Sequence, residues 1–212
     1  MYPLSFKRFI ASSRQPIATL STLSIVFISM ALLGTISSQA ATYLLVPDNS
    51  NVRFEIDHFN TSTNSGGFYN LTGQVEYDAQ AKLGKVSIVI PINSLNTGNI
   101  AFDNVLKGAD FFEVEKYPLA TFDSTKWYFA DDKSESPVTK VEGNLTMHGQ
   151  THPITLSATK FNCYFSFIAK SSVCGGDFTT TIDRRKWDMG KYSLLGITEK
   201  VVLKVQIEAA KQ

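Results

Sequence analysis

Apolar and polar side chains alternate along most of the chain after residue 40. In the segment 51–59, apolar residues alternate with charged residues from Val52 to Asp57, and His58 continues the apolar face. The same period of two residues recurs in the segments 84–92, 121–129, 139–147, 153–161 and 199–209. Such alternation predicts strands of an antiparallel sheet that covers a core with one face and meets water with the other.

Turns are predicted where short polar segments separate these strands. The segments are DNSN (48–51), NSGG (64–67), DAQAKLG (78–84), DDKSESP (131–137) and HGQTHP (148–153). Many short strands with polar turns between them predict an all-β sandwich or barrel. A closed barrel of about eight strands leaves room for packed side chains or for one small ligand.

The interval from Ser94 to Pro118 lacks this alternation. Within it, residues 101–108 have the pattern of a short helix, with Asn99 as the N-cap and Gly108 as the stop. An insertion at this point, between two strands, would cover one end of the sheet. Residues 41–212 contain no repeat, low-complexity tract or linker, which predicts one domain.

The first forty residues form a separate segment. Three basic residues are followed by the apolar run 17–36 and then by the small residues Ser38 and Ala40. This order is typical of a signal peptide cleaved after Ala40, which would leave 212 − 40 = 172 residues in the periplasm or outside the cell. The alternative is a retained transmembrane anchor, because the apolar run is nearly long enough to span a bilayer. No later segment is apolar enough to do so.

Charge and cysteine content narrow the function classes. Without the leader, the chain has 17 basic and 19 acidic residues, a net charge of −2, and no basic surface for nucleic acid is expected. Cys163 and Cys174 are the two cysteines, and export to an oxidising compartment predicts a disulfide between them. Two free thiols are the alternative, whereas the spacing excludes a redox CxxC motif.

No catalytic or metal-binding motif stands out. His148 and His152 have the spacing of a helical zinc pair, but Gly149 and Pro153 would break a helix, and the turn contains no third ligand. A turn is therefore the favoured interpretation. The chain has no nucleophile elbow, P-loop or dinucleotide-binding glycine motif, so neither a catalytic residue nor a cofactor is assigned.

Two polar residues are candidates for contact with a ligand. His58 lies on the apolar face of its strand, where it could meet the polar head of a ligand in a cavity; the alternative is a core histidine bonded to a neighbour. Arg184, in the segment TIDRRKW, is the second candidate, with a surface ion pair as its alternative. Abundant phenylalanine, with 15 residues, by itself favours a plain core over a ligand site.

A series of motifs resembles the YceI-like family of bacterial lipid- and polyisoprenoid-binding barrels. The motifs occur in the family's order: SNVRFEIDHF, GGFYNLTGQVEYD, VSIVIPINSLNT, FDNVLKGADFFEVEKYPLATFDST, VEGNLTMHGQTHPITL and TTIDRRKWDMG. The resemblance covers nearly all of residues 43–208. It implies an extended, lipocalin-like, eight-stranded antiparallel barrel with a short helical insertion, exported to the periplasm, with a long isoprenoid or amide-type lipid in the barrel of some members.

The resemblance also implies positions for a ligand site. His58 matches the family's histidine, Asp110 to Phe112 match its ADFF turn, and Arg184 matches the arginine of its IDR motif. The segment GNIAFDNVL after Thr97 and the aromatic Trp187 depart from the usual pattern, which affects the head group of the ligand more than the fold. With the inward strand faces, the expected ligand-binding residues are Phe54, Ile56, His58, Phe68, Ile88, Ile90, Phe111, Phe112, Phe122 and Arg184.

Three classes of function remain. The first is a non-enzymatic binder of a long-chain amphiphile, with an apolar cavity for the chain and a few polar groups for the head. The second is a stress-response or interaction module whose barrel is filled by its own side chains. The third, an enzyme on an isoprenoid or quinone-like substrate, is the least supported because no catalytic constellation is visible. Ligand identity and oligomeric state, including a homodimer, stay open.

Overall fold

The computed structural model describes residues 40–131 and 138–212, which belong to one compact unit. The expected signal peptide and most of the expected turn at 131–137 lie outside the described residues. Ten strands form one antiparallel sheet in the described part of the chain. They are β1 (Ala41–Leu45), β2 (Asn51–His58), β3 (Ser62–Phe68), β4 (Thr72–Asp78), β5 (Leu83–Pro91), β6 (Leu119–Phe129), β7 (Val138–Met147), β8 (Gln150–Ser166), β9 (Ser171–Asp183) and β10 (Ile197–Lys211).

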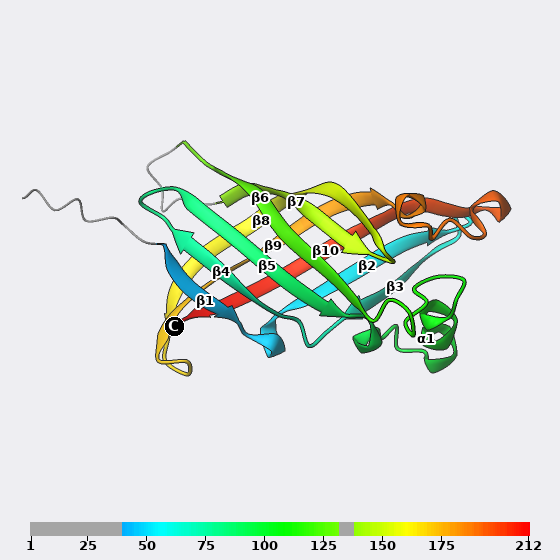
Figure 1. Ribbon diagram of the computed structural model, residues 1–212, viewed down its shortest axis with the longest axis horizontal. Coiled ribbons are helices and arrows are strands. Elements are labelled where there is room, and N and C mark those ends of the chain that lie inside the picture. The colour runs from blue at the N-terminus through cyan, green and yellow to red at the C-terminus, as the bar shows by residue number, and fades with distance from the viewer. Residues whose placement is uncertain (1–39, 132–137) are drawn as a thin grey trace, which may run out of the picture. The chain divides into compact units, whose positions relative to one another are not determined.

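The sheet closes on itself into an eight-stranded barrel, as expected (Figure 1). Its neighbours follow the order β1-β4-β5-β6-β7-β8-β9-β10, and β10 returns to pair with β1. Strand β2 follows β1 along the same edge of β10, and β3 and β4 pair with β2 and β1 in the same way. The ten strands therefore occupy eight strand positions in the barrel. Closure through the β1–β10 pairing removes the edges that β1 and β10 would otherwise leave unpaired at this end of the sheet.

The interruption between β1 and β2 is bridged by one buried serine. Residues Pro47–Asn49 make a single 3₁₀ turn, and Ser50, which is 1% exposed, follows it. The Ser50 hydroxyl donates to the carbonyl oxygen of Glu208 and accepts from the Glu208 amide, at 3.2 Å in each case. The Glu208 carbonyl also accepts from the Val46 amide at 2.8 Å, so the Ser50 hydroxyl supplies the partner that the Glu208 amide loses where the neighbouring strand is interrupted.

One stretch of the barrel wall is not closed by strands. On the side away from β2, β3 makes only an isolated bridge between Gly67 and Asn96 within the described residues. The segment 92–118, which contains α1 (Ile100–Lys107), lies next to this gap, and α1 packs at the same end of the barrel (Figure 1). The expected helix is thus confirmed, with a start one residue earlier.

Helix α1 forms because its ends are capped by the expected residues. The side chain of Asn99 accepts hydrogen bonds from the amides of Ala101 at 3.0 Å and Phe102 at 3.2 Å, and Gly108 ends the helix. Its inward face buries Leu106, while Ile100 and Val105 point to solvent. No helix in the described parts of the chain has the length and hydropathy needed to cross a membrane.

The expected turn at NSGG was wrong, because Asn64 to Gly67 lie inside β3. The chain turns earlier, at Phe59 and Asn60, which both adopt positive φ angles. Glycine is needed at position 66 for a packing reason. A Cβ atom there would lie 2.6 Å from the ring of Phe54, so the aromatic side chain occupies the space that a larger residue would take.

The other predicted strands match the structure, with β8 extending further than expected, to Ser166. Strands β1, β3, β4 and β9 were not predicted from the alternation. Cys163 and Cys174 form the expected disulfide and lie opposite each other on β8 and β9. Apolar side chains from every strand face the barrel interior. Among the most completely buried are Val173 of β9, Leu71 between β3 and β4, and Trp187 after β9.

We expect Ser50→Ala to lower the free energy of unfolding by about 1–3 kcal/mol, because it leaves the partly buried amide of Glu208 in β10 without its partner, while the Glu208 carbonyl group keeps the Val46 amide. Ser65→Ala is the matched control, since Ser65 is exposed on β3. Urea unfolding of both variants measures the effect. Equal stability of the two variants would show that Ser50 does not maintain the junction.

Candidate functional site

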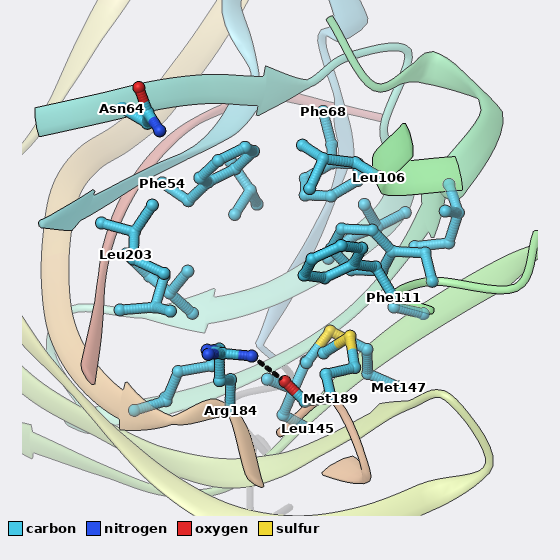
Figure 2. Close-up of a pocket in the computed structure, with 18 of the residues that line it drawn as sticks. Phe54, Asn64, Phe68, Leu106, Phe111, Leu145, Met147, Arg184, Met189 and Leu203 are labelled. Carbon is cyan, nitrogen blue, oxygen red and sulfur yellow. Dashed lines mark hydrogen bonds between the residues drawn. The ribbon is translucent and has the colours of Figure 1, made fainter. Parts of the chain in front are cut away.

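A cavity of about 180 Å³ lies inside the barrel at the end where α1 packs (Figure 2). Its walls come from β2, β3, β5, the segment 92–118, β6, β7, and the region where β9 leads into β10. Apolar side chains supply nearly the whole lining. Those not among the expected ligand-binding residues are Val52, Ile92, Phe102, Leu106, Ala120, Leu145, Met147, Ile182, Met189, Ile197, Val201 and Leu203.

Aromatic rings form one wall of the cavity. The ring centroids of Phe54 and Phe68 are 6.0 Å apart, and those of Phe68 and Phe112 are 5.3 Å apart in an edge-to-face arrangement. Leu106 from α1 and Phe111 lie on the same side of the cavity (Figure 2). Because these residues come from both the barrel and the insertion, the segment 92–118 is part of the site and does more than cover an end.

The polar groups of the lining are Asp57, His58, Asn64 and Arg184. Three of them lie on neighbouring backbone positions: His58 is paired with Ile197 of β10, Ile56 with Asn64, and Asp57 precedes His58. Within the described residues, the side chains of His58 and Asn64 make no hydrogen bond, whereas Asp57 accepts one from the Asn60 amide at 2.8 Å. Two polar side chains are therefore free to bind a ligand at this end.

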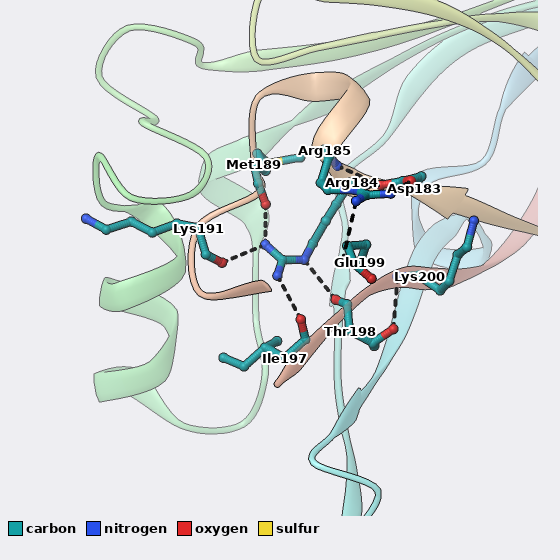
Figure 3. A network of polar contacts seen from close by, with 9 residues as sticks. All are labelled: Asp183, Arg184, Arg185, Met189, Lys191, Ile197, Thr198, Glu199 and Lys200. Atoms are coloured by element: carbon teal, nitrogen blue, oxygen red, sulfur yellow. Dashed lines mark hydrogen bonds and ion pairs between the residues drawn. The ribbon is translucent and has the colours of Figure 1, made fainter. Parts of the chain in front are cut away.

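Arg184 is buried and is bound by backbone carbonyl groups (Figure 3). Its Nε donates to Thr198 at 3.0 Å, Nη1 donates to Met189 and to Lys191, the latter at 3.0 Å, and Nη2 donates to Ile197 at 3.3 Å. Four of its five N–H groups are thus used, and the chain from residue 189 to 198 is wrapped around the guanidinium. The alternative of a surface ion pair was wrong.

Burial without a contacting carboxylate changes the electrostatics of Arg184. Desolvation lowers the pKa of its guanidinium, and the charges of Glu199 and Asp183 offset part of this effect. Asp183 itself pairs with Arg185 on the outer side, at 2.6 Å, and this hydrogen bond lowers the pKa of its carboxyl to about 2. The carboxylate therefore stays charged near the buried cation across the physiological pH range.

Eight of the ten expected ligand-binding residues are brought together in this cavity: Phe54, Ile56, His58, Phe68, Ile90, Phe111, Phe112 and Arg184. Ile88 and Phe122 are not; they line a second cavity of about 40 Å³ in the other half of the barrel. The space inside the barrel is therefore divided between these two cavities, with the larger one at the α1 end.

Some cavity residues could have been found from the sequence and others could not. Leu145, Met147, Val201 and Leu203 lie on apolar strand faces that the alternation already indicated. Asn64 was missed because the NSGG segment was interpreted as a turn. Phe102 and Leu106 are four residues apart in α1 and share one helical face, but the sequence did not show that this face enters the barrel; Met189 comes from an irregular segment, where no period relates one side chain to the next.

The two histidines of HGQTHP lie outside the cavity and pack on Trp187. His148 and Gly149 form a two-residue hairpin turn with φ angles of 51° and 73°, which confirms a turn in this segment, but residues 150–153 already belong to β8. The Nδ1 atom of His148 lies 2.9 Å from the carbonyl oxygen of Trp187, and the His152 ring meets the Trp187 ring edge-on at 5.1 Å. No group of three metal-ligating side chains occurs among the described residues.

Comparisons with known proteins agree with this fold. A model of the YceI-like domain matches residues 43–209. A UPF0312 protein of Pseudomonas putida is 30% identical over 194 residues, which cover 90% of this chain and 97% of that protein. The crystal structure of Burkholderia cenocepacia BcnA is similar, with a TM-score of 0.61 and 21% identity over 78% of this chain and 99% of that one.

A further similar structure is described as a polyisoprenoid binding domain from Saccharophagus degradans implicated in plant cell wall breakdown. Its TM-score is 0.57 and its identity 16%, over 82% of this chain and 99% of that one. At these identities, both solved structures support the fold alone.

We expect Arg184→Met to be more destabilising than Arg185→Met, by about 3 kcal/mol or more. The first variant leaves four backbone carbonyl groups without a donor, whereas Arg185 makes ion pairs at the surface. Denaturant unfolding measures the difference, and hydrogen exchange should locate the loss of protection in residues 189–198. Similar losses of stability in both variants would contradict this role of Arg184.

Proposed function

We propose that this chain, which belongs to the YceI-like domain family, is a non-enzymatic binding protein that holds a long-chain amphiphile in the barrel. A polyisoprenoid or a fatty-acyl lipid has the required shape and polarity. The observation that carries the proposal is the cavity of about 180 Å³ with an almost wholly apolar lining. A cavity of this kind offers little to a polar ligand and removes an apolar chain from water.

Apolar burial would supply most of the binding free energy. Each buried CH₂ group contributes about 0.8 kcal/mol, so a dozen would contribute roughly 10 kcal/mol before the cost of ordering the chain. The aromatic wall formed by Phe54, Phe68 and Phe112 adds polarizable contact surface. A ligand bound in this way should dissociate slowly and remain with the protein during purification.

The polar head would lie among His58, Asn64 and Arg184. The amide of Asn64 and the fifth N–H group of Arg184 are donors, and the His58 ring can donate one hydrogen bond. These groups favour a head that accepts hydrogen bonds, such as a carbonyl, hydroxyl or acidic oxygen. The apolar tail would then extend toward Leu145, Met147 and Phe112.

A second candidate is a module whose barrel is filled by its own side chains. The half of the barrel away from α1 favours it, because Tyr77, Trp127 and Phe161 pack there with ring centroids 5.2–6.4 Å apart and leave only the cavity of about 40 Å³. The larger cavity at the α1 end is the reason to prefer the binder. A description of a relative as polyisoprenoid-binding also supports this choice.

The proposed binder acts in the periplasm, which the leader pattern and the disulfide support. We expect the mature chain to start at Ala41 or within about two residues of it, as signal-peptidase cleavage after small residues requires. Intact-mass measurement on the periplasmic fraction tests this. A full-length chain in the membrane fraction would instead show that the apolar run is kept as an anchor.

The ligand is tested by native mass spectrometry of the natively purified protein and of two cavity variants. Ile90→Glu places a carboxylate in the apolar cavity, and Ala120→Phe fills part of the space with an apolar ring. We expect a ligand in the wild type and its loss from both variants. Leu119→Glu is the control, because Leu119 neighbours Ala120 but is 51% exposed.

Ala120→Phe keeps the test informative if the buried charge unfolds Ile90→Glu. A wild type that carries no ligand and takes up neither polyprenyl nor fatty-acyl probes would contradict the binder and favour the self-filled module. Turnover of such a probe by the purified protein would contradict the non-enzymatic assignment.

A further inference from the structure

We propose that the protein docks on a lipid bilayer through the end of the barrel where the polar groups of the cavity lie. The docking element is an exposed rim of four uncharged residues, Phe59, Tyr192, Leu194 and Leu195. Their exposed fractions are 48%, 38%, 98% and 69%, which is unusual for large apolar side chains that gather in one place. This inference rests on the proposed function, because the bilayer is the source or the destination of the ligand.

The rim is continuous with the cavity. Phe59 follows the cavity residue His58, and Leu195 comes two positions before the cavity residue Ile197. His58 and Ile197 are themselves paired across β2 and β10. A Cβ atom on Gly196 would lie 2.7 Å from the Phe59 ring, so the β2–β3 turn and the 192–196 segment touch. The exposed apolar surface therefore begins where the cavity lining ends.

The rim is held in place and not merely exposed. Ser193–Leu195 form a 3₁₀ turn, and the Tyr192 ring lies 6.0 Å from the ring of Phe111 in the cavity wall. The Tyr192 hydroxyl donates to Asp110 at 2.9 Å. Arg184 binds the Lys191 and Ile197 carbonyl groups on either side of this turn. Leu194 and Leu195 thus project from a segment that these contacts hold in place, which lowers the conformational entropy lost when the two side chains bind a surface.

The low solubility of a long-chain ligand in water is the reason to propose a bilayer as the partner. A long apolar chain has a very low free concentration in water, so a protein that holds one must exchange it with a lipid phase. Exchange is direct only if the mouth of the cavity meets that phase. Apolar residues at the mouth allow the chain to pass from lipid to cavity without crossing water.

The charge of the rim indicates which bilayers it would bind. Lys191 is the one charged residue between Gly190 and Gly196, and its ammonium group is paired with Asp110. The turn from Phe59 to Ser62 carries no charge. Docking would therefore depend on apolar insertion rather than on anionic lipid, and it should respond little to salt.

The opposite end of the barrel supplies a matched control. Phe167 and Ile168, at the tip of the β8–β9 hairpin, are 87% and 98% exposed, comparable to Leu194 and Leu195. This tip lies at the far end from α1 and the β2–β3 turn (Figure 1). The tip is as apolar as the rim but is not continuous with the larger cavity. Comparing variants of the two ends therefore distinguishes docking at the cavity from non-specific binding of exposed apolar residues.

The experiment measures co-sedimentation of the natively purified protein with sucrose-loaded phosphatidylcholine vesicles. We expect the wild type to bind and Leu194→Ser/Leu195→Ser to bind about tenfold more weakly, because two inserted side chains are lost. Phe167→Ser/Ile168→Ser should bind as the wild type does. Native mass spectrometry of the same samples reports ligand content, and thermal unfolding reports the fold.

Each outcome decides the question. A wild type that carries ligand but does not sediment, or equal loss in both double variants, overturns the docking proposal and leaves the binder intact. A wild type without ligand and without probe uptake contradicts the binder itself. A wild-type dimer that Leu194→Ser/Leu195→Ser converts to a monomer, with no vesicle binding, assigns the rim to a second copy of the chain and also overturns the proposal.

Discussion

The hydrogen bonding of β10 along both of its edges is the constraint on which the rest of the structure depends. One edge pairs with β9 over eleven residue pairs from Lys200 to Ala210, and the other pairs first with β2 and then with β1. Because β1 and β2 are separated by a turn, the second edge is interrupted there. The Ser50 hydroxyl accepts from the Glu208 amide and donates to the Glu208 carbonyl, which also accepts from the Val46 amide, so both backbone groups of Glu208 are bonded at the junction.

Closure also determines where a cavity can form. Strand β4 pairs with β1 on one edge and with β5 on the other, whereas β3 has only a single bridge on the edge away from β2. The barrel wall is therefore incomplete beside β3. The segment 92–118 completes the wall with the side chains of Leu106, Phe111 and Phe112, where a strand would complete it with backbone hydrogen bonds. A wall of side chains packs less regularly than a strand, and the larger of the two cavities lies beside it. The half of the barrel closed by strands alone is almost filled.

Arg184 connects the cavity to the rim. Its buried guanidinium binds carbonyl groups of residues 189, 191, 197 and 198, which gives an irregular segment the fixed shape that a strand would obtain from its neighbours. The same residue lines the cavity with one donor to spare. A single side chain thus supports both the polar end of the proposed ligand site and the apolar residues through which we propose the site reaches a bilayer.

The sequence by itself determined an all-β fold, the helix at 101–108 to within one residue with its Asn99 cap, the disulfide and six of the ten strands that the structure describes, because each depends on local periodicity or on a pairing of two unique residues. The choice of a closed barrel over a sandwich came from the family resemblance. The sequence also identified the inward faces, since a period of two assigns every side chain of a strand to one side. Tertiary structure alone decided that Asn64 to Gly67 form a strand, because the two glycines serve packing and not a turn: the Phe54 ring of the neighbouring strand occupies the space beside Gly66. It alone divided the interior between Ile90 and Ile88, which share one face of β5 yet line different cavities. The burial of Arg184 among carbonyl groups was also decided by tertiary structure alone. Those carbonyl groups come from residues 189–198, an aperiodic segment whose path depends on its hydrogen bonds to the Arg184 guanidinium.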